Sequence, residues 1–135
     1  MQLSIFAPDR TLLVDEEVTE VTLYGSEGQI EILPGHSDFL GTLETGMFSF
    51  NSKTGTEARN FGVISTGFVE VDSNKVTVVA ETLEMRDEID LERAVQAQRV
   101  AEEAFRKEGF DMHQFRKYEL KLQRALIRQQ VAKMK

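Results

Sequence analysis

The period of the hydrophobic pattern changes once along this chain of 135 residues, near Glu81, and this change constrains the fold most strongly. Before it, short runs of alternating apolar and polar residues are typical of β-strands, and eight of the nine glycines and both prolines lie before residue 70. After it, the period is near 3.6 and neither glycine nor proline occurs until Gly109, which predicts helices. We therefore expect an α+β chain, with an N-terminal β-sandwich or barrel at residues 1–87 and a C-terminal antiparallel two-helix hairpin at residues 88–135.

Eight strands are expected in the first domain, and the second of them is expected to be bent or broken. They are Gln2 to Ala7, Thr11 to Tyr24, Gln29 to Leu33, Asp38 to Glu44, Met47 to Phe50, Thr56 to Ser65, Gly67 to Val71 and Lys75 to Ala80. The polar run Asp72-Ser73-Asn74-Lys75 lies between the last two alternating runs, which predicts a β-hairpin there.

Two helices are expected after the change of period. Asp90 is a suitable N-cap for the first helix, because its carboxylate can accept an early backbone N–H, and Gly109 is a suitable residue at its end. Asp111 is a suitable N-cap for the second helix, which is expected to run to about Lys133. The short connection leaves an antiparallel pair.

Small side chains dominate the expected seam between these helices. Spacings of three and four residues place in it Ala94, Ala97, Ala101 and Ala104 of the first helix and Phe115, Tyr118, Leu122, Ala125, Gln129 and Ala132 of the second. A buried methyl group contributes only about 0.8 kcal/mol. We therefore predict a marginally stable hairpin that can open.

Charge is distributed unevenly along the chain. The net charge of −7 argues against a general nucleic-acid binder. Residues 1–90 carry seventeen acidic and five basic residues, whereas residues 111–135 carry two acidic and seven basic residues. The basic second helix either rests on the acidic first domain or binds a partner.

The composition indicates a chain that folds in water. Its hydrophobic fraction of 41% is ordinary, and the absence of cysteine excludes disulfides, thiolate metal sites and cysteine nucleophiles. The first ten residues do not resemble a signal peptide, and no apolar stretch reaches about eighteen residues. We expect neither export nor direct insertion into a membrane.

Few residues suit catalysis. His36, Ser37 and Asp38 are consecutive and point in different directions, so they do not form a catalytic triad. His36 and His113 are the only histidines, and neither has a carboxylate at a recognised metal-ligand spacing. Phosphate-loop and dinucleotide-binding motifs are absent as well. We expect no catalytic residue and no metal site, and the chain is not expected to be an enzyme.

Three arginines of the expected hairpin form a candidate anion site. If the turn lies near residue 110, Arg93 lies opposite residue 127 and close to Arg124 and Arg128, which are one helical turn apart. Guanidinium groups suit bidentate contacts with phosphate. Salt bridges are the alternative, and the acidic residues available for them are Glu84, Asp90 and Glu92.

Three stretches resemble the epsilon subunit of F-type ATP synthases. They are YGSEGQIEILPGHSDFLGTLETG, GVISTGFVEVDSNKVTVVAE and IDLERA, in the same order over nearly the whole chain. The resemblance implies a flattened β-sandwich followed by a helical hairpin. It also implies binding to the gamma subunit, contact with the c-ring, and inhibition of ATP hydrolysis by helices that extend toward the alpha and beta subunits of the catalytic head. The implied location is peripheral, on the cytoplasmic face of the bacterial inner membrane, in an enzyme that translocates protons or sodium ions.

The resemblance places the c-ring contact on one turn and one loop. The residues concerned are Ser26, Glu27, Gly28, Gln29 and Ile30 of the turn and Gly35, His36 and Ser37 of the loop. Many bacterial members carry an acidic residue at the position of Gln29, so a charge pair there is not transferred to this chain. Glu31 is expected to point to the opposite face of its strand.

In some bacterial members the folded hairpin binds ATP, with or without magnesium, and in others the same motif only caps the helix. The matching residues are Glu84, Ile89, Asp90, Arg93, Ala94, Arg124 and Arg128. A further arginine of the ATP-binding pattern aligns with Val100, and the adjacent Arg99 points about 100° away on a helix. ATP is thus expected as a regulatory ligand rather than a required cofactor.

Two other functions stay open alongside a rotor subunit. One is a free-standing protein that senses ATP by closing its hairpin, and the other is a nucleic-acid adaptor that uses the basic second helix. Co-purification with a membrane ATPase separates the rotor subunit from both, and salt-dependent binding to duplex DNA would favour the adaptor. The expected partners include no nucleic acid.

Overall fold

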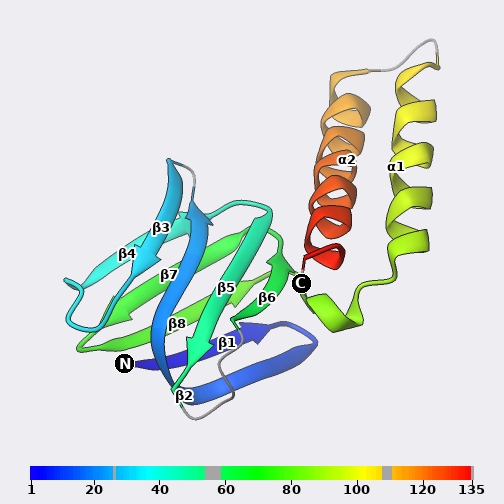
Figure 1. Ribbon diagram of the computed structural model, residues 1–135. Helices are drawn as coiled ribbons and strands as arrows, with labels where there is room; N and C mark the ends of the chain where they lie inside the picture. Colours follow the sequence, from blue (N-terminus) through cyan, green and yellow to red (C-terminus); the bar gives the residue numbers. More distant parts are fainter. Residues whose placement is uncertain (26, 54–58, 108–110, 135) are drawn as a thin grey trace. The chain divides into compact units, whose positions relative to one another are not determined.

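The computed structural model describes residues 1–25, 27–53, 59–107 and 111–134. The chain divides into two compact units, of which the first is Met1–Met85 and the second begins at Arg86. Figure 1 shows strands throughout the first unit and two long helices in the second. None of the described helices has the length and hydropathy needed to span a membrane.

Nine strands make up the described part of the first unit. They are β1 (Gln2–Ala7), β2 (Arg10–Gly25), β3 (Gly28–Ile32), β4 (Phe39–Leu43), β5 (Gly46–Ser52), β6 (Asn60–Ile64), β7 (Gly67–Asp72), β8 (Lys75–Ala80) and β9 (Leu83–Met85). The eight expected strands are β1 to β8. The sixth was expected to begin at Thr56, but β6 begins at Asn60, and residues 54–58 lie outside the described part. The short strand β9 was not expected.

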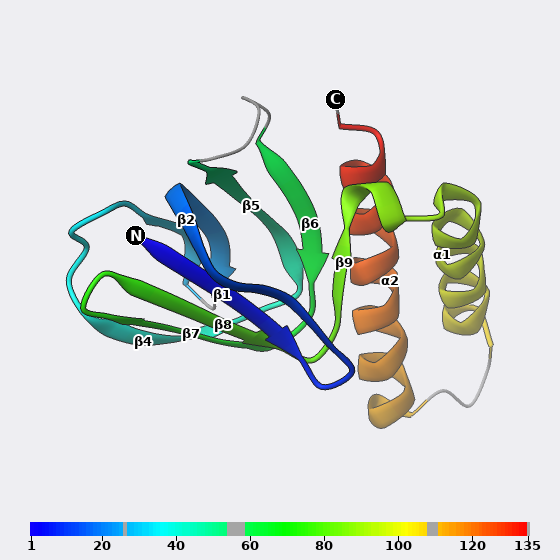
Figure 2. The ribbon, with the colours of Figure 1, turned by 90° about the horizontal axis from the view of Figure 1, so that it is seen from below.

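The strands form one hydrogen-bonded sheet that folds into two layers. The order is β1-β8-β7-β4-β2-β5-β6-β9, and β3 pairs with β2. The long strand β2 joins the layers, because its first half pairs with β1 and its second half with β5. It is bent as expected, with register shifts in both pairings and a φ of 51° at Asp15. The result is the expected β-sandwich, whose layers are visible in Figures 1 and 2.

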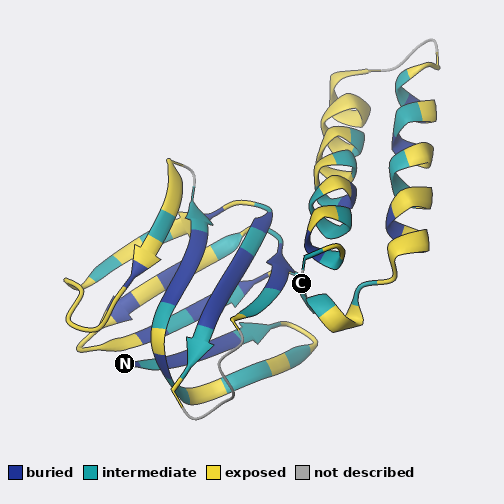
Figure 3. Cartoon of the chain, in the orientation of Figure 1, coloured by how far each residue is buried: buried dark blue, intermediate teal, exposed yellow. Residues whose placement is uncertain are grey.

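The core lies between these layers. Strand residues alternate between buried and exposed, which Figure 3 shows as alternating colours along the strands. Each such apolar side chain contributes about 1.5–3 kcal/mol when it leaves water. The largest fully buried side chains are Phe48, Leu3, Ile5, Leu23, Ile32 and Ile64.

The hairpin between β7 and β8 has the expected turn. Asp72 pairs with Lys75, and the two residues between them, Ser73 and Asn74, have φ values of 51° and 66°. Positive φ at both central positions matches the right-handed twist of the flanking strands. The polar run therefore reverses the chain in two residues.

Two helices follow a short 3₁₀ turn, η1 (Arg86–Glu88), in the second unit: α1 (Leu91–Phe105) and α2 (Met112–Ala132). Both expected N-caps are confirmed: Asp90 accepts a hydrogen bond from Arg93 N at 3.2 Å, and Asp111 accepts one from Gln114 N at 2.8 Å. The helix α1 ends at Phe105, earlier than its expected end near Gly109, which lies outside the described residues.

The seam between α1 and α2 is built from small residues, as expected. Ala94, Ala101, Ala104 and Ala125 are all buried, and in Figure 3 the buried positions of α1 lie on the side turned toward α2. Val131, which the spacing did not place in the seam, is fully buried as well.

Two contacts mark how the helices lie along each other. The rings of Phe105 and Phe115, which a turn near residue 110 sets opposite each other, lie 5.2 Å apart. Nearer the open end, Gln129 Nε2 donates a hydrogen bond to Ala94 O at 3.4 Å.

Candidate functional site

The tip of the β2–β3 hairpin borders a shallow groove of about 570 Å³. Gly28 has a φ of 118°, which side chains with a Cβ rarely adopt, so glycine suits this turn. A side chain at position 25 would crowd the turn, because its Cβ would lie only 2.8 Å from Cδ1 of Ile30. The residues that line the groove are Gly25, Glu27, Gly28, Gln29, Ile30, Leu40, Gly41 and Thr42.

The residues expected at the c-ring fall into two groups. Glu27, Gly28, Gln29 and Ile30 line the tip groove, and Ser26 lies outside the described residues. The second group follows the other end of β3 and consists of Gly35, His36 and Ser37, all of which are exposed. Because β3 has five residues, the groups lie at opposite ends of a strand about 17 Å long.

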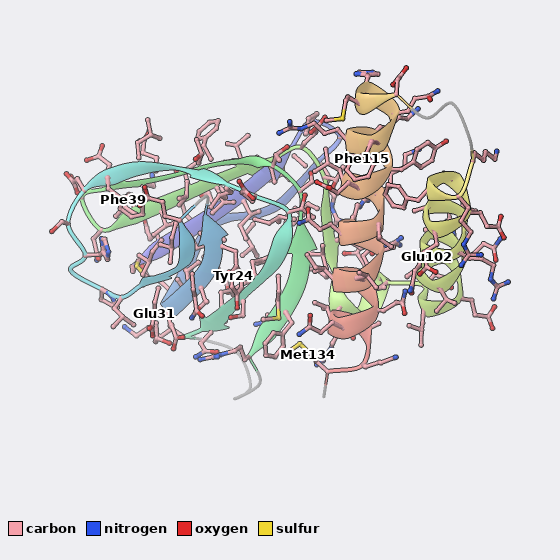
Figure 4. The ribbon with its side chains drawn as sticks, turned by 90° about the horizontal axis from the view of Figure 1, so that it is seen from above. Tyr24, Glu31, Phe39, Glu102, Phe115 and Met134 are labelled. Atoms are coloured by element: carbon pink, nitrogen blue, oxygen red, sulfur yellow. The ribbon has the colours of Figure 1, made fainter. Side chains whose placement is uncertain are left out.

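The loop of the second group is fastened to the β7–β8 turn. Gly35 N donates to Asn74 Oδ1 at 3.1 Å, and Ser73 N donates to Asp38 Oδ1 at 2.9 Å. The ring of His36 lies 5.1 Å from that of Phe39, which Figure 4 labels on the first unit. These contacts hold the loop in a defined conformation, and they leave His36 and Asp38 in structural roles rather than in a triad.

Glu31 lies on the same face of β3 as Gln29. Both side chains are exposed, whereas Ile30 is half-buried and Ile32 is buried. The expectation that Glu31 points to the opposite face was wrong, because side chains two residues apart on a strand share a face. Figure 4 labels Glu31 at the margin of the sandwich. A carboxylate is therefore present on the exposed face of β3 one pleat away from Gln29.

An apolar patch covers the outer face of β4 and β7. Leu40 is 70% exposed and Phe68 is 43% exposed. They line a second groove, of about 480 Å³, together with Gly41, Thr42 and Glu70. Leu40 pairs across the strands with Glu70, and Thr42 with Phe68. We call Leu40, Thr42, Phe68 and Glu70 the β4–β7 patch.

The sequence reasoning missed this patch as a functional surface, although a signal was present. In Gly67-Phe68-Val69-Glu70-Val71, the valines take the buried positions, so Phe68 occupies an outward position usually held by a polar residue. Leu40 breaks the alternation of β4 in the same way. Because Leu40, Gly41 and Thr42 line both grooves, the patch continues into the β2–β3 tip.

The second candidate surface is the group of arginines on the hairpin. Arg93 is exposed and follows the N-cap Asp90, while Arg124 and Arg128 are half-buried on α2. Arg128 is adjacent to Gln129, which contacts Ala94, so Arg128 lies within one helical turn of the level of Arg93 along the hairpin. Arg124 lies about 6 Å nearer the turn. Convergence of all three on one anion stays a prediction.

The other residues expected at ATP are distributed over both units. Ile89 is half-buried directly before the cap residue Asp90, and Ala94 is buried in the seam. Glu84 lies in β9, in the first unit. Arg99 and Val100 are both exposed on α1. The second unit therefore carries the guanidinium groups of Arg93, Arg124 and Arg128 and the start of α1 in the sequence IDLERA. Guanidinium groups and helix N-termini are suited to polyphosphate binding.

A chain of side-chain hydrogen bonds crosses the seam between these helices. Gln129 Nε2 donates to Gln98 Oε1 at 2.7 Å, and Gln98 Nε2 donates to Glu102 Oε1 at 2.6 Å. Figure 4 labels Glu102 on α1 and Phe115 on α2. Gln129 was expected in the seam, but its partners were not identified from the sequence.

The described residues contain no group of His, Cys, Asp and Glu side chains that could hold a metal ion. The surfaces described above are an apolar patch on β4 and β7, a polar tip between β2 and β3, and the basic helix α2.

Two family models match the chain, one for each part. The beta-sandwich domain of the ATP synthase Delta/Epsilon chain matches residues 1–86, and the long alpha-helix domain of the same chain matches residues 87–133.

Curated relatives match over nearly the full length. An ATP synthase epsilon chain of Geotalea daltonii is 43% identical, and the match covers 98% of this chain and 93% of the relative. The ATP synthase epsilon chain of Geobacter sulfurreducens is 40% identical over the same shares of both chains.

Solved structures share the fold at low sequence identity. A chain of the Euglena gracilis mitochondrial ATP synthase superposes with a TM-score of 0.82 at 23% identity, over 93% of this chain and 77% of that one. A chain of the Tetrahymena thermophila mitochondrial ATP synthase, from its central stalk and c-ring, gives a TM-score of 0.67 at 16% identity. The superposition covers 98% of this chain and 96% of that one.

Proposed function

Because this chain belongs to the epsilon-chain family of F-type ATP synthases, we propose that it couples the gamma subunit to the c-ring and inhibits ATP hydrolysis through its C-terminal helices. The role is that of a non-catalytic subunit in the central stalk of an enzyme that translocates protons or sodium ions. The observation that carries the proposal is the match of both family models, which together extend over residues 1–133.

The β4–β7 patch is the proposed gamma-binding surface. Leu40 and Phe68 are the exposed large apolar residues of these two strands, and burying such a side chain contributes about 1.5–3 kcal/mol. Glu70 lies opposite Leu40 in the patch, so a basic or hydroxyl-bearing residue of gamma fits beside its apolar contacts. Exposed apolar surface rimmed by polar residues is typical of a protein–protein contact.

The β2–β3 tip is the proposed c-ring contact. It presents Glu27 and Gln29 at the end of a tight turn, and Glu31 adds a carboxylate on the same exposed face of β3. Polar side chains on a rigid turn suit the polar loops that face the stalk. The groove continues into the β4–β7 patch through Leu40, Gly41 and Thr42, so one continuous surface can contact both partners.

The helical hairpin is the proposed inhibitory element. With the hairpin closed the rotor turns freely, and after opening the basic helix α2 meets acidic surfaces of the alpha and beta subunits and blocks hydrolysis. The 21 residues of α2 span about 32 Å, a length suited to reaching from the stalk toward the head. The alanine seam supports opening, because it buries little apolar surface.

ATP is the proposed regulatory ligand of the closed hairpin, bound through Arg93, Arg124 and Arg128. If only the closed form binds, ATP at tenfold its dissociation constant favours closure by about 1.4 kcal/mol. That free energy suffices to shift a marginal equilibrium. The proposed location of the subunit is peripheral, on the cytoplasmic face of the bacterial inner membrane, within the complex.

Co-purification tests the assignment to the rotor. The tagged chain is expected to carry gamma and the membrane-bound ATPase with it, and Leu40→Asp or Phe68→Asp is expected to reduce recovered gamma more than tenfold. Val14→Asp is the matched control, because Val14 is also an exposed strand residue, at 62%, and lies outside the patch.

Equal loss of gamma from all three variants would contradict the proposed surface. Recovery of the wild-type chain alone, with ATP binding retained, would replace the rotor role by the free-standing ATP sensor. Recovery with DNA in a salt-dependent manner would replace it by the nucleic-acid adaptor.

A further inference from the structure

We propose that Gln129, Gln98 and Glu102 form a polar latch that holds the two-helix hairpin closed in the absence of nucleotide. The latch is a conformational device of the second unit alone. Its regulatory meaning rests on the proposed function, whereas its existence does not.

The latch is a directed chain of hydrogen bonds. Gln129 Nε2 on α2 donates to Gln98 Oε1 at 2.7 Å and to Ala94 O at 3.4 Å, both on α1. Gln98 Nε2 donates in turn to Glu102 Oε1 at 2.6 Å. All three side chains are half-buried. The carboxylate of Glu102 accepts the hydrogen bond from Gln98, and a charged acceptor makes this bond stronger. The bond polarises the amide of Gln98, which strengthens the hydrogen bond that Gln98 Oε1 accepts from Gln129.

Because the seam between α1 and α2 consists mainly of alanines, these hydrogen bonds contribute a large share of the free energy that holds the hairpin closed. The buried seam residues Ala94, Ala101 and Ala125 contribute little apolar area, so the helices gain little free energy from packing alone. Opening the seam would separate Gln129 from both of its partners. A polar residue in an otherwise apolar seam also specifies the register of two helices, which agrees with the observed pairing of Gln129 with Ala94.

The latch acts at the end of the hairpin where opening begins. At the other end the chain connects the helices directly, and the rings of Phe105 and Phe115 lie 5.2 Å apart. At the open end, Gln129 joins the last turns of α2 to the first turns of α1. Arg86 Nη1 supports it there by donating to Met134 O at 3.3 Å.

The latch is distinct from the arginines that are proposed to bind ATP. None of its hydrogen bonds involves Arg93, Arg124 or Arg128. The closed hairpin therefore has a fastening that needs no ligand, and ATP adds to a closure that already exists. In this chain the resting hairpin is closed.

Distance measurement on the full chain tests the latch. The chain has no cysteine, so Gln96→Cys and Gln123→Cys place spin labels only at two exposed positions, one on each helix. Without nucleotide, pulsed electron–electron double resonance is expected to give one dominant short distance. Gln129→Leu and Gln98→Leu are each expected to shift the closed-to-open ratio about tenfold toward open, equivalent to about 1.4 kcal/mol. The two together are expected to shift it little further, because they remove the same contact.

Gln130→Leu is the matched control, because Gln130 is the exposed neighbour of Gln129 on α2, and it is expected to leave the distances unchanged. The proposal is overturned if the unsubstituted chain is mainly open without nucleotide, if Gln129→Leu shifts the ratio no more than Gln130→Leu, or if the effects of the two latch variants add. Helix content measured by circular dichroism reports whether α1 and α2 are folded in each variant.

Hydrolysis by the reconstituted complex separates the latch from the proposed function. If Gln129→Leu opens the hairpin and hydrolysis stays the same, the latch stands and the inhibitory role fails. If Gln129→Leu leaves the distances unchanged, the latch fails whatever the hydrolysis rate.

Discussion

The rings of Phe105 and Phe115 pack against each other at the turn end of the helical hairpin, with centroids 5.2 Å apart and an angle of 58° between their planes. In Figure 4, Phe115 projects from α2 toward α1. Phe115 is still 43% exposed, and the buried residues of the seam are mainly alanines. The pair therefore adds an aromatic contact to this seam at its turn end.

Phe115→Ala tests the aromatic pair. Removing one ring forfeits about 0.5–1.5 kcal/mol of ring–ring interaction in addition to its buried area, so hydrogen exchange of the amides in α1 and α2 is expected to accelerate about tenfold. Met112→Ala is the control, because Met112 lies one turn earlier on α2 and is 81% exposed. Equal acceleration by both substitutions would show that the ring pair does not hold the turn end.

Gly67→Ala tests the close contact between β7 and β8. A Cβ at Gly67 would overlap the carbonyl oxygen of Val79, a backbone atom that cannot move aside without disturbing the hairpin. The expected loss is about 1–3 kcal/mol in the free energy of unfolding of the first unit, measured by urea titration.

Gly41→Ala is the control for this substitution. A Cβ there would lie 3.2 Å from Cε2 of Phe39, an atom of a side chain that can move slightly, so the change is expected to be below about 1 kcal/mol. A loss at Gly67 no larger than at Gly41 would contradict the described approach of β7 to β8.

Calorimetric titration with ATP and magnesium tests the arginines of the hairpin. Binding to the full chain is expected, and Arg93→Ala or Arg128→Ala is expected to weaken it more than tenfold, because a charge-assisted hydrogen bond contributes about 1.5–3 kcal/mol. Arg116→Ala is the control, since Arg116 is exposed near the start of α2. No heat with the unsubstituted chain, or equal weakening by Arg116→Ala, would exclude the proposed nucleotide site.

Local patterns predicted most of the fold. Alternation identified β1 to β8, and the capping residues Asp90 and Asp111 identified the starts of both helices, because these signals depend on residues close together in the chain. The strand β9 was missed because its three residues become a strand only by pairing with β6, for example Gly62 with Met85. Such a non-local partner leaves no periodic signal in so short a segment.

The candidate sites were predicted less completely. The β2–β3 tip and the arginines came from a resemblance and from helical spacing, but the relation of Arg93 to α2 depends on the length and path of the connection, which spacing alone does not determine. The β4–β7 patch was overlooked because Leu40 and Phe68 resemble core residues until the alternation of their strands is assigned. Which face of each strand turns inward is set by the opposite layer of the sandwich.

The rate of ATP hydrolysis by a reconstituted complex measures whether the C-terminal helices inhibit the enzyme. The complex is assembled once with the full chain and once with a chain that ends at Ile89 and so lacks both helices. We expect faster hydrolysis with the shortened chain, because α2 can no longer reach the catalytic head, and equal recovery of gamma in both assemblies. An unchanged rate at equal assembly would contradict an inhibitory role for the C-terminal helices.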